Sequence, residues 1–237
     1  MQPMRSASLF GGALLSAGFT ASAEDITVFD QTPNGVVAYA SNEPGSYLDF
    51  QQADDFTLGA SYTQVTGASW VGVEEALFSD DFPPGNIAGF NVSIFADDEG
   101  LPGEALLSRD FAIEELSVTD LGIPLQDSTA FEISADFQFD GAAGETYWFS
   151  TIALLDQSFE DNWFWAATSE SDRPGWAGSV FGESFFPRLP TDDANGLAFS
   201  IRAVPTPGTA GLLGLAGLAA ARRAHRGRGA LHTAFKI

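Results

Sequence analysis

The side chains in this sequence that could do chemistry are almost all carboxylates. Between Glu24 and Ala203 there is no histidine and no lysine, and the whole chain contains no cysteine. This composition excludes nucleophile–histidine pairs, Ser–Lys dyads, Schiff bases and histidine- or cysteine-rich zinc sites from that stretch. Two kinds of carboxylate chemistry remain, which are cation binding and hydrolysis by a pair of acids.

Calcium binding is one hypothesis, because hard oxygen ligands cluster at two predicted turns. The first turn carries Asp97, Asp98, Glu99 and, slightly further on, Glu104, and the second reads Asp-Asp-Ala-Asn-Gly over 192–196. Calcium is bound by oxygen atoms of this kind. The alternative is that Asp, Asn and Gly are simply good turn formers. Calcium is the only cofactor that the sequence suggests.

Paired acids could also hydrolyse a glycosidic bond, provided that two carboxylates lie on facing strands. Glu74 and Glu132 are examples of suitable residues, but no motif selects them. Among 32 acidic residues a chance pair at a suitable spacing is expected. We therefore do not expect an enzyme, and a glycoside hydrolase ranks third among the functional hypotheses.

A group of aromatic residues suggests carbohydrate binding. Trp163 and Trp165 are two residues apart, so in a strand both point to the same face of the sheet. Together with Trp176 and Arg173 they could form a ligand-binding face on which sugar rings stack. The alternative is that large aromatic residues on one face form the hydrophobic core.

The charge is distributed unevenly along the chain. Residues 24–203 contain all 32 acidic residues and only four arginines, which gives this stretch a net charge of −28. A field of that sign repels phosphate backbones, so nucleic acid is not expected as a partner.

Alternating polar and apolar residues predict an all-β fold for residues 24–203. The period of two is clear around Val92 and Ile94 and again around Phe137 and Phe139. Eleven short predicted strands, separated by turn residues, favour a single jelly-roll-like antiparallel β-sandwich. Only residues 113–121 are predicted to form a short helix.

The first 23 residues have the layout of a secretory signal peptide. Arg5 supplies the positive charge, Leu9–Phe19 is apolar, and Ala21-Ser22-Ala23 provides an A-x-A cleavage site before the acidic Glu24. This pattern predicts export.

The C-terminal part of the chain has three successive features. The motif Val204-Pro205-Thr206-Pro207-Gly208 is followed by a charge-free stretch to Ala221 and then by Arg222 and Arg223. This layout resembles the PEP-CTERM sorting signal of exported bacterial proteins, over about 25 residues. The resemblance implies recognition by an exosortase-type membrane protease and transient membrane anchoring through a short hydrophobic helix.

The region between the two ends is similar to uncharacterised β-sandwich domains that accompany PEP-CTERM tails. The similarity rests on short pieces within residues 50–203, such as Ala53–Leu58, Phe90–Gly103 and Trp163–Ala167. We therefore expect a signal peptide (1–23), an acidic sandwich (24–203), a sorting segment (204–228) and a disordered tail (229–237).

These observations lead to one preferred function. We expect an exported structural or adhesive component of the cell surface or extracellular matrix. A carbohydrate-binding module for extracellular polysaccharide, with calcium-stabilised loops, is the alternative.

Overall fold

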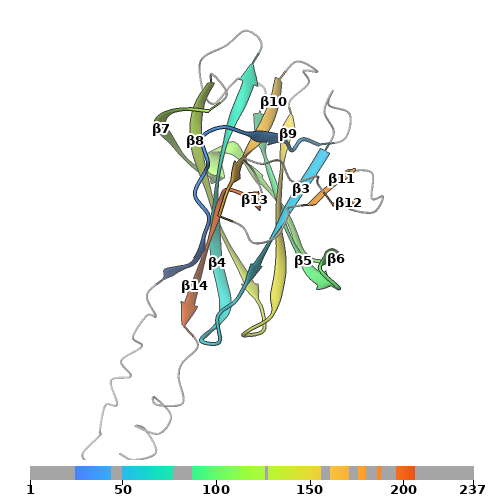
Figure 1. Ribbon diagram of the computed structural model, residues 1–237. Helices are drawn as coiled ribbons and strands as arrows, with labels where there is room; N and C mark the ends of the chain where they lie inside the picture. The colour runs from blue at the N-terminus through green and yellow to red at the C-terminus, as the bar shows by residue number, and fades with distance from the viewer. Residues whose placement is uncertain are drawn as a thin grey trace, which may run out of the picture.

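The computed structural model describes residues 25–43, 50–76, 87–125, 128–155, 161–170, 176–179, 186–187 and 196–205. These residues form two antiparallel β-sheets that pack face to face (Figure 1). Several predicted features lie outside the described residues: the signal peptide, Arg173, the motif residues Thr206, Pro207 and Gly208, the arginines Arg222 and Arg223, and the tail 229–237.

Sheet 1 has eight strands in the described part of the chain, and sheet 2 has six. Sheet 1 consists of β1 (Ile26–Asp30), β2 (Ala38–Ala40), β4 (Tyr62–Ala76), β7 (Ser117–Leu125), β8 (Ser128–Asp140), β10 (Asp161–Thr168), β13 (Gly196–Leu197) and β14 (Phe199–Pro205). Sheet 2 consists of β3 (Phe50–Thr57), β5 (Ile87–Asp98), β6 (Leu101–Ala112), β9 (Thr146–Leu155), β11 (Trp176–Ser179) and β12 (Phe186–Pro187).

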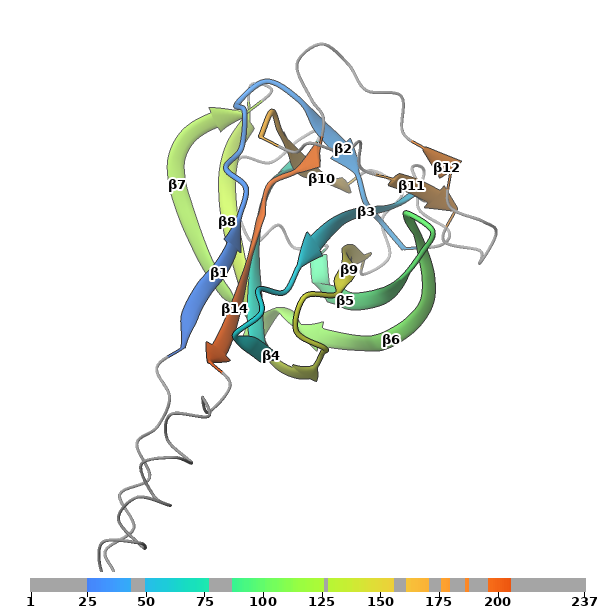
Figure 2. The same cartoon turned by 60° about the horizontal axis from the view of Figure 1, so that its bottom comes forward.

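The strand order confirms the predicted jelly-roll-like sandwich. In sheet 1, β1, β14, β4, β8 and β7 are successive neighbours, and β10 continues the pairing of β4 beyond β14. In sheet 2 the order is β12-β11-β3-β9-β5-β6. Strands that are close in sequence, such as β3 and β4 or β8 and β9, therefore lie in opposite sheets, as the jelly-roll arrangement requires (Figure 2).

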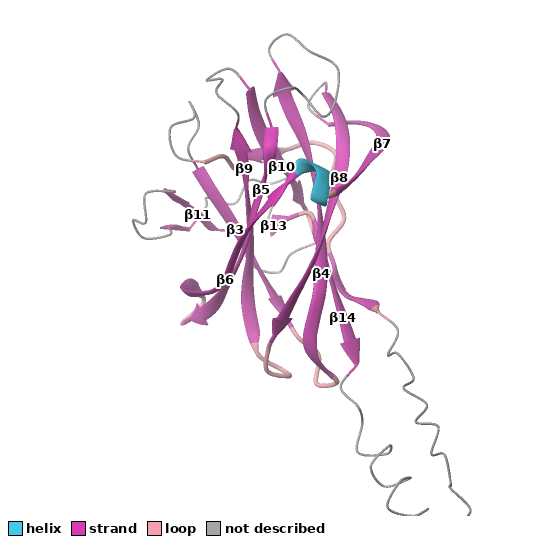
Figure 3. Ribbon diagram, turned by 180° about the vertical axis from the view of Figure 1, so that it is seen from behind, coloured by secondary structure: helices cyan, strands magenta, loops and turns pink. Residues whose placement is uncertain are grey.

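The expected helix over residues 113–121 is wrong for most of its length. Only Ile113–Glu115 forms a 3-10 turn (Figure 3), and β7 begins at Ser117. The strand is favoured because β7 pairs with β8, from Ser117 opposite Ser134 to Leu125 opposite Ser128. Its β-branched residues Val118 and Ile123 suit a pleated strand better than a helix.

The core between the sheets is mainly aromatic. Trp70, Trp163 and Trp165 come from sheet 1, and Phe90 and Phe149 come from sheet 2, and all are buried. Edge-to-face contacts link the two sheets, with the rings of Phe90 and Trp163 centred 5.2 Å apart and those of Phe149 and Trp165 5.6 Å apart. Such contacts stabilise the packing beyond the burial of area alone.

A short segment, which we call the strap (residues 38–43), joins the sheets along one side. Ser41 N donates to Trp163 O of β10 at 3.0 Å, and Ser41 O accepts from Ala153 N of β9 at 2.9 Å. The side chain of Asn42 adds a further bond, because its Oδ1 accepts from Trp163 N at 2.7 Å. The strap therefore satisfies backbone groups of both sheets where β10 approaches β9.

The described chain enters and leaves the sandwich at the same end, which we call the terminal pole. Ile26 of β1 lies opposite Ala203 of β14, and Pro205 lies opposite Tyr62 of β4. The turns after β3 and β8 lie at the same end, as the bond from Gly141 N to Thr63 O at 2.8 Å indicates (Figure 1).

The last strand of the sandwich extends into the first two residues of the predicted sorting segment (204–228). Val204 and Pro205, the first two residues of the motif, continue β14 and pair with β4. Proline is tolerated here because it is the last residue of the strand, where a missing backbone donor costs little. Within the described residues no helix is long and apolar enough to span a bilayer.

Replacing Gly72 by alanine is expected to destabilise the domain by about 1–3 kcal/mol. A Cβ at this position of β4 would press into the carbonyl oxygen of Phe164 and the indole ring of Trp163. Chemical denaturation of the two proteins would measure the loss. Gly59→Ala is the matched control, because its Cβ would meet only the ring of Tyr62, at 3.3 Å, and an equal loss in both variants would contradict the argument.

Candidate functional site

The sugar-binding face that was predicted around Trp163 and Trp165 is not available to a ligand. Trp163 and Trp165 are both fully buried between the sheets, opposite Glu74 and Gly72 of β4. The prediction that they form a sugar-stacking face is therefore wrong, and the core alternative is correct. Trp165 Nε1 donates to Ala198 O at 2.8 Å, which satisfies the one polar atom of the ring inside the protein. Trp176 lies in β11, with its backbone opposite Ala53 of β3.

The acidic turn at residues 97–104 is built as a hairpin turn. Glu99 and Gly100 have φ values of 55° and 87°, and they connect β5 to β6 as a two-residue loop of the kind that favours tight hairpins. Asp97 closes the turn, since its Oδ2 accepts from Gly100 N at 3.2 Å and its Oδ1 accepts from Trp148 Nε1 at 2.9 Å.

The geometry of this turn does not bring metal ligands together. Asp98 is the last residue of β5, Glu99 lies in the turn and Glu104 lies further along β6, and all three are exposed. In the part of the chain that the structure describes, no three Asp, Glu, His or Cys side chains gather closely enough to hold a metal ion. Calcium binding by Asp97, Asp98, Glu99 and Glu104 is therefore not supported, and the alternative of favourable turn residues accounts for the sequence. Residues 192–195 of the second predicted calcium turn lie outside the described residues.

The two glutamates considered for acid-pair chemistry lie on opposite faces of sheet 1. Glu74 lies opposite Trp163 and is buried on the inner side of the sheet. Glu132 lies opposite Val71 and lines a depression on the outer side. The sheet separates the two carboxylates, so they cannot act on one glycosidic bond.

The depression on the outer side of sheet 1 has a volume of about 280 Å³. Asp30, Thr32, Glu132 and Ser200 contribute its polar groups, and Val71, Leu121 and Phe199 contribute apolar ones. Thr32 at its rim holds Glu170 through two bonds, from its hydroxyl to Oε1 at 2.7 Å and from its backbone N–H to Oε2 at 3.2 Å. The hydroxyl and then the N–H of Thr32 lower the pKa of the exposed Glu170.

Replacing Thr32 by valine is expected to raise the pKa of Glu170 towards its ordinary value, because the hydroxyl donor is lost and only the backbone donor remains. A lowered pKa in the folded state adds stability above the unfolded pKa, and this stability is lost as the pH falls through the folded pKa. The free energy of unfolding of the variant should therefore fall less than that of the wild type as the pH drops through the folded pKa of Glu170. An NMR titration of the Glu170 carboxyl carbon would measure the shift. Thr146→Val, at an exposed threonine pair on sheet 2, is the control, and an unchanged Glu170 titration in Thr32→Val would contradict the assignment.

A second polar site lies on the outer face of sheet 2, and we call it the sheet 2 groove. It has a volume of about 320 Å³ and crosses four strands. Its polar residues are Glu43, Gln51, Asn91, Ser93, Ser108 and Asp110, and its apolar residues are Phe95, Ala105, Ile152 and Leu154.

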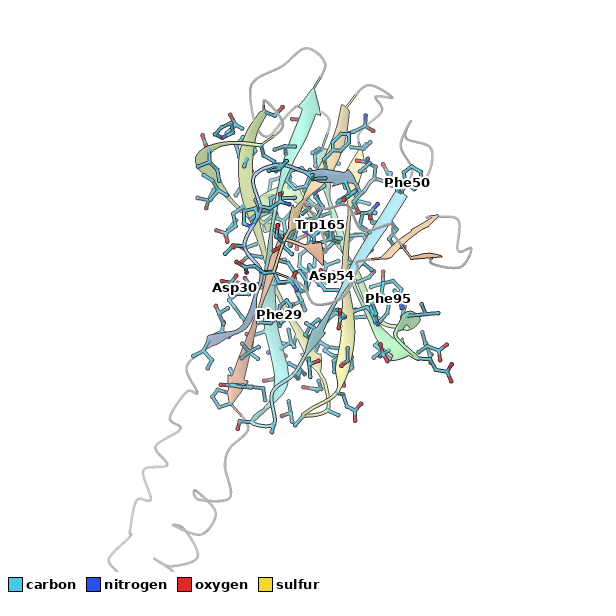
Figure 4. All side chains as sticks on the ribbon, viewed as in Figure 1. Phe29, Asp30, Phe50, Asp54, Phe95 and Trp165 are labelled. Carbon is cyan, nitrogen blue, oxygen red and sulfur yellow. The ribbon has the colours of Figure 1, made fainter. Side chains whose placement is uncertain are left out.

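The chain folds so that alternate residues of each strand line this groove. On β5, Phe90, Val92 and Ile94 are buried in the core, so Asn91, Ser93 and Phe95 take the outer face. Phe95 is labelled in Figure 4. In the antiparallel register, Asn91 has Asp110 of β6 as its neighbour on one side and Ile152 of β9 as its neighbour on the other side.

A hydrogen-bonded network fixes the polar side chains of the groove. Asn91 Nδ2 donates to Asp110 Oδ1 at 2.7 Å and to Ser108 Oγ at 3.1 Å. Ser93 Oγ donates to Asn91 Oδ1 at 2.8 Å, and the Ser93 side chain is itself almost fully buried at the floor. The orientation of the Asn91 amide is therefore set by its neighbours, and the groove is ordered before any ligand binds.

No family model, no curated protein and no solved structure matches this chain.

The sheet 2 groove was not predicted from the sequence. Its signal was the alternation of polar Asn91 and Ser93 with apolar core residues, but the register that adds Asp110 and Ile152 is not visible in one strand.

Proposed function

We propose that this chain is an exported protein of the cell surface or extracellular matrix, and that its sandwich is a non-catalytic structural or adhesive module. An exosortase-type protease would process the segment 204–228, after transient anchoring of that segment in the membrane. The mature part would then consist of the acidic sandwich.

The terminal pole is the single observation that best supports this proposal. The strand that leads to the sorting motif, β14, ends at the same pole at which β1 begins. A tether at Pro205 would therefore hold the sandwich by one end and leave the opposite end and both outer sheet faces turned away from the membrane. A display module needs this arrangement, and the high negative charge of residues 24–203 favours solubility there.

Peptide mapping of both ends of the secreted protein would test the proposal. We expect the mature N-terminus at Glu24, and we expect loss of the residues that follow the motif, when the gene is expressed in a bacterium that has an exosortase. Replacing Pro205 and Pro207 by alanine should leave N-terminal cleavage intact and abolish C-terminal processing. A full-length chain that stays in the cytoplasm with both ends intact would refute the proposal.

A carbohydrate-binding module is the second candidate, because the sheet 2 groove offers a site for it even though Trp163 and Trp165 do not. The groove combines hydroxyl, amide and carboxylate groups with apolar side chains on one exposed face.

A further inference from the structure

We propose that the sheet 2 groove binds a neutral glycan, with sugar hydroxyls at Asn91 and Asp110 and a sugar ring face further along the same strands at Phe95 and Ala105. This inference rests on the proposed function of a surface-exposed binding module. The proposed site therefore lies on the outer face of sheet 2, and not at Trp163 and Trp165, which are buried between the sheets.

The polar side of the groove matches the hydrogen-bonding chemistry of sugar hydroxyls. A hydroxyl group both donates and accepts, and it is bound best by a mixture of carboxylates, amides and other hydroxyls. Asp110 is exposed, and Asn91 Nδ2 donates to only one of its two oxygens, Oδ1. Ser108 is exposed beside it on β6. Since Asn91 and Ser93 already hold these groups in place, a ligand would not have to order them.

The groove has an apolar end that suits the carbon–hydrogen face of a pyranose ring. Phe95 is partly exposed on β5, four residues along the strand from Asn91, and it lies opposite the exposed Ala105 of β6. Ile152 lies opposite Asn91 instead and is buried, so it belongs to the floor of the groove. Ligand sites commonly combine such apolar surface with a few polar groups that orient the ligand. The volume of the groove is at the lower end of the range for small-molecule sites, which corresponds to roughly one or two sugar rings.

The charge of the groove selects a neutral ligand over an acidic one. Glu43 and Asp110 are the charged residues of the lining. The nearest arginine on β6, Arg109, is directed elsewhere, with its guanidinium 4.2 Å from the ring centre of Phe111 and 3.5 Å from Glu115. Uronic acids and sulfated sugars would meet uncompensated negative charge, so they should be excluded.

Binding would be tested on the full chain with hexasaccharides of three kinds: a neutral glucan or mannan, an acidic oligogalacturonate and a cationic glucosamine oligomer. Chemical-shift mapping by NMR would locate the bound sugar, and titration would give its affinity. We expect saturable binding of a neutral hexasaccharide with shifts confined to β5, β6 and β9, and no binding of the acidic one.

Two groove variants would then be compared with one control. Asn91→Ala and Asp110→Asn should each weaken neutral-glycan binding by about tenfold or more, because each removes a fixed polar partner. Glu132→Gln, which changes a carboxylate in the depression of sheet 1, should leave the affinity unchanged. Thermal unfolding of each variant separates a lost contact from a lost fold.

Three results would overturn the inference. These are the absence of neutral-glycan binding, shifts that map outside the groove, or binding of the glucosamine oligomer alone that disappears at high salt. Failure of the groove is also distinguishable from failure of the proposed function. A chain that is exported and processed but binds no glycan refutes only the groove, whereas an unprocessed cytoplasmic chain refutes the surface function.

Discussion

Replacing Trp165 by alanine should lower the free energy of unfolding by about 3–5 kcal/mol, the largest loss that we expect from any single side chain here. The ring is fully buried, contacts the rings of Phe149 and Phe199, and bonds to Ala198 O. Its removal leaves a large cavity between the sheets and takes away one of the two donors to Ala198 O, which still accepts from Val71 N at 3.2 Å. Urea denaturation followed by circular dichroism would measure the loss of free energy. Thermal unfolding should show a midpoint that is lower by roughly 10 °C.

The control for this experiment is an exposed apolar residue on sheet 2. Leu106 of β6 is 46 % exposed, so Leu106→Ala should change the unfolding free energy by no more than about 0.5 kcal/mol. If Trp165→Ala cost as little as Leu106→Ala, the ring could not be in the core. The sugar-stacking interpretation of Trp163 and Trp165 would then have to be reconsidered.

The second large effect is expected for Asp54, a fully buried carboxylate on the inner side of β3. Its Oδ2 accepts from Leu197 N of β13, in the opposite sheet, at 2.7 Å, and its Oδ1 accepts from Asp55 N at 3.0 Å. Gln31 joins the same cluster, because its Nε2 donates to Asp54 Oδ2 at 3.2 Å and to Leu197 O at 2.9 Å. One side chain, labelled Asp54 in Figure 4, thus links β3, β13 and the segment that carries Gln31.

Replacing Asp54 by alanine should therefore cost about 1–3 kcal/mol, because buried N–H donors lose their carboxyl acceptor. Asp54→Asn keeps one acceptor oxygen and should lose less. Asp140→Asn is the control at an exposed carboxylate, which accepts from Gln64 Nε2 at 3.0 Å. Hydrogen exchange at Leu197 would report the local effect, and an unchanged exchange rate in Asp54→Ala would contradict the proposed link.

The class of fold could be predicted from the sequence, because the period of two is a local property. The alternation around Val92 and Ile94 lies within β5, and the alternation around Phe137 and Phe139 lies within β8. The helix expected over residues 113–121 failed because β7 forms through pairing with β8, which one segment of sequence does not reveal.

The candidate site was less predictable than the fold. Spacing placed Trp163 and Trp165 on one face of a strand, but it could not tell which face is buried. That depends on which sheet covers β10, and Phe90 and Phe149 of sheet 2 do so. The groove requires β5, β6 and β9 to be neighbours, although Asn91 and Ile152 are separated by 61 positions in the numbering.

The position of β14 has a mechanical consequence for a protein tethered through its C-terminal end. This strand lies between β1 and β4 and is hydrogen-bonded to both along most of its length. A pull on Pro205, directed away from a ligand held on the sandwich, would load those bonds in shear along the strand, so that many must break together. Forced detachment is governed by the rate of unfolding, and shear loading makes that rate low. The architecture would therefore suit the surface role that we propose, in which the sandwich carries a load between its tether and a bound ligand.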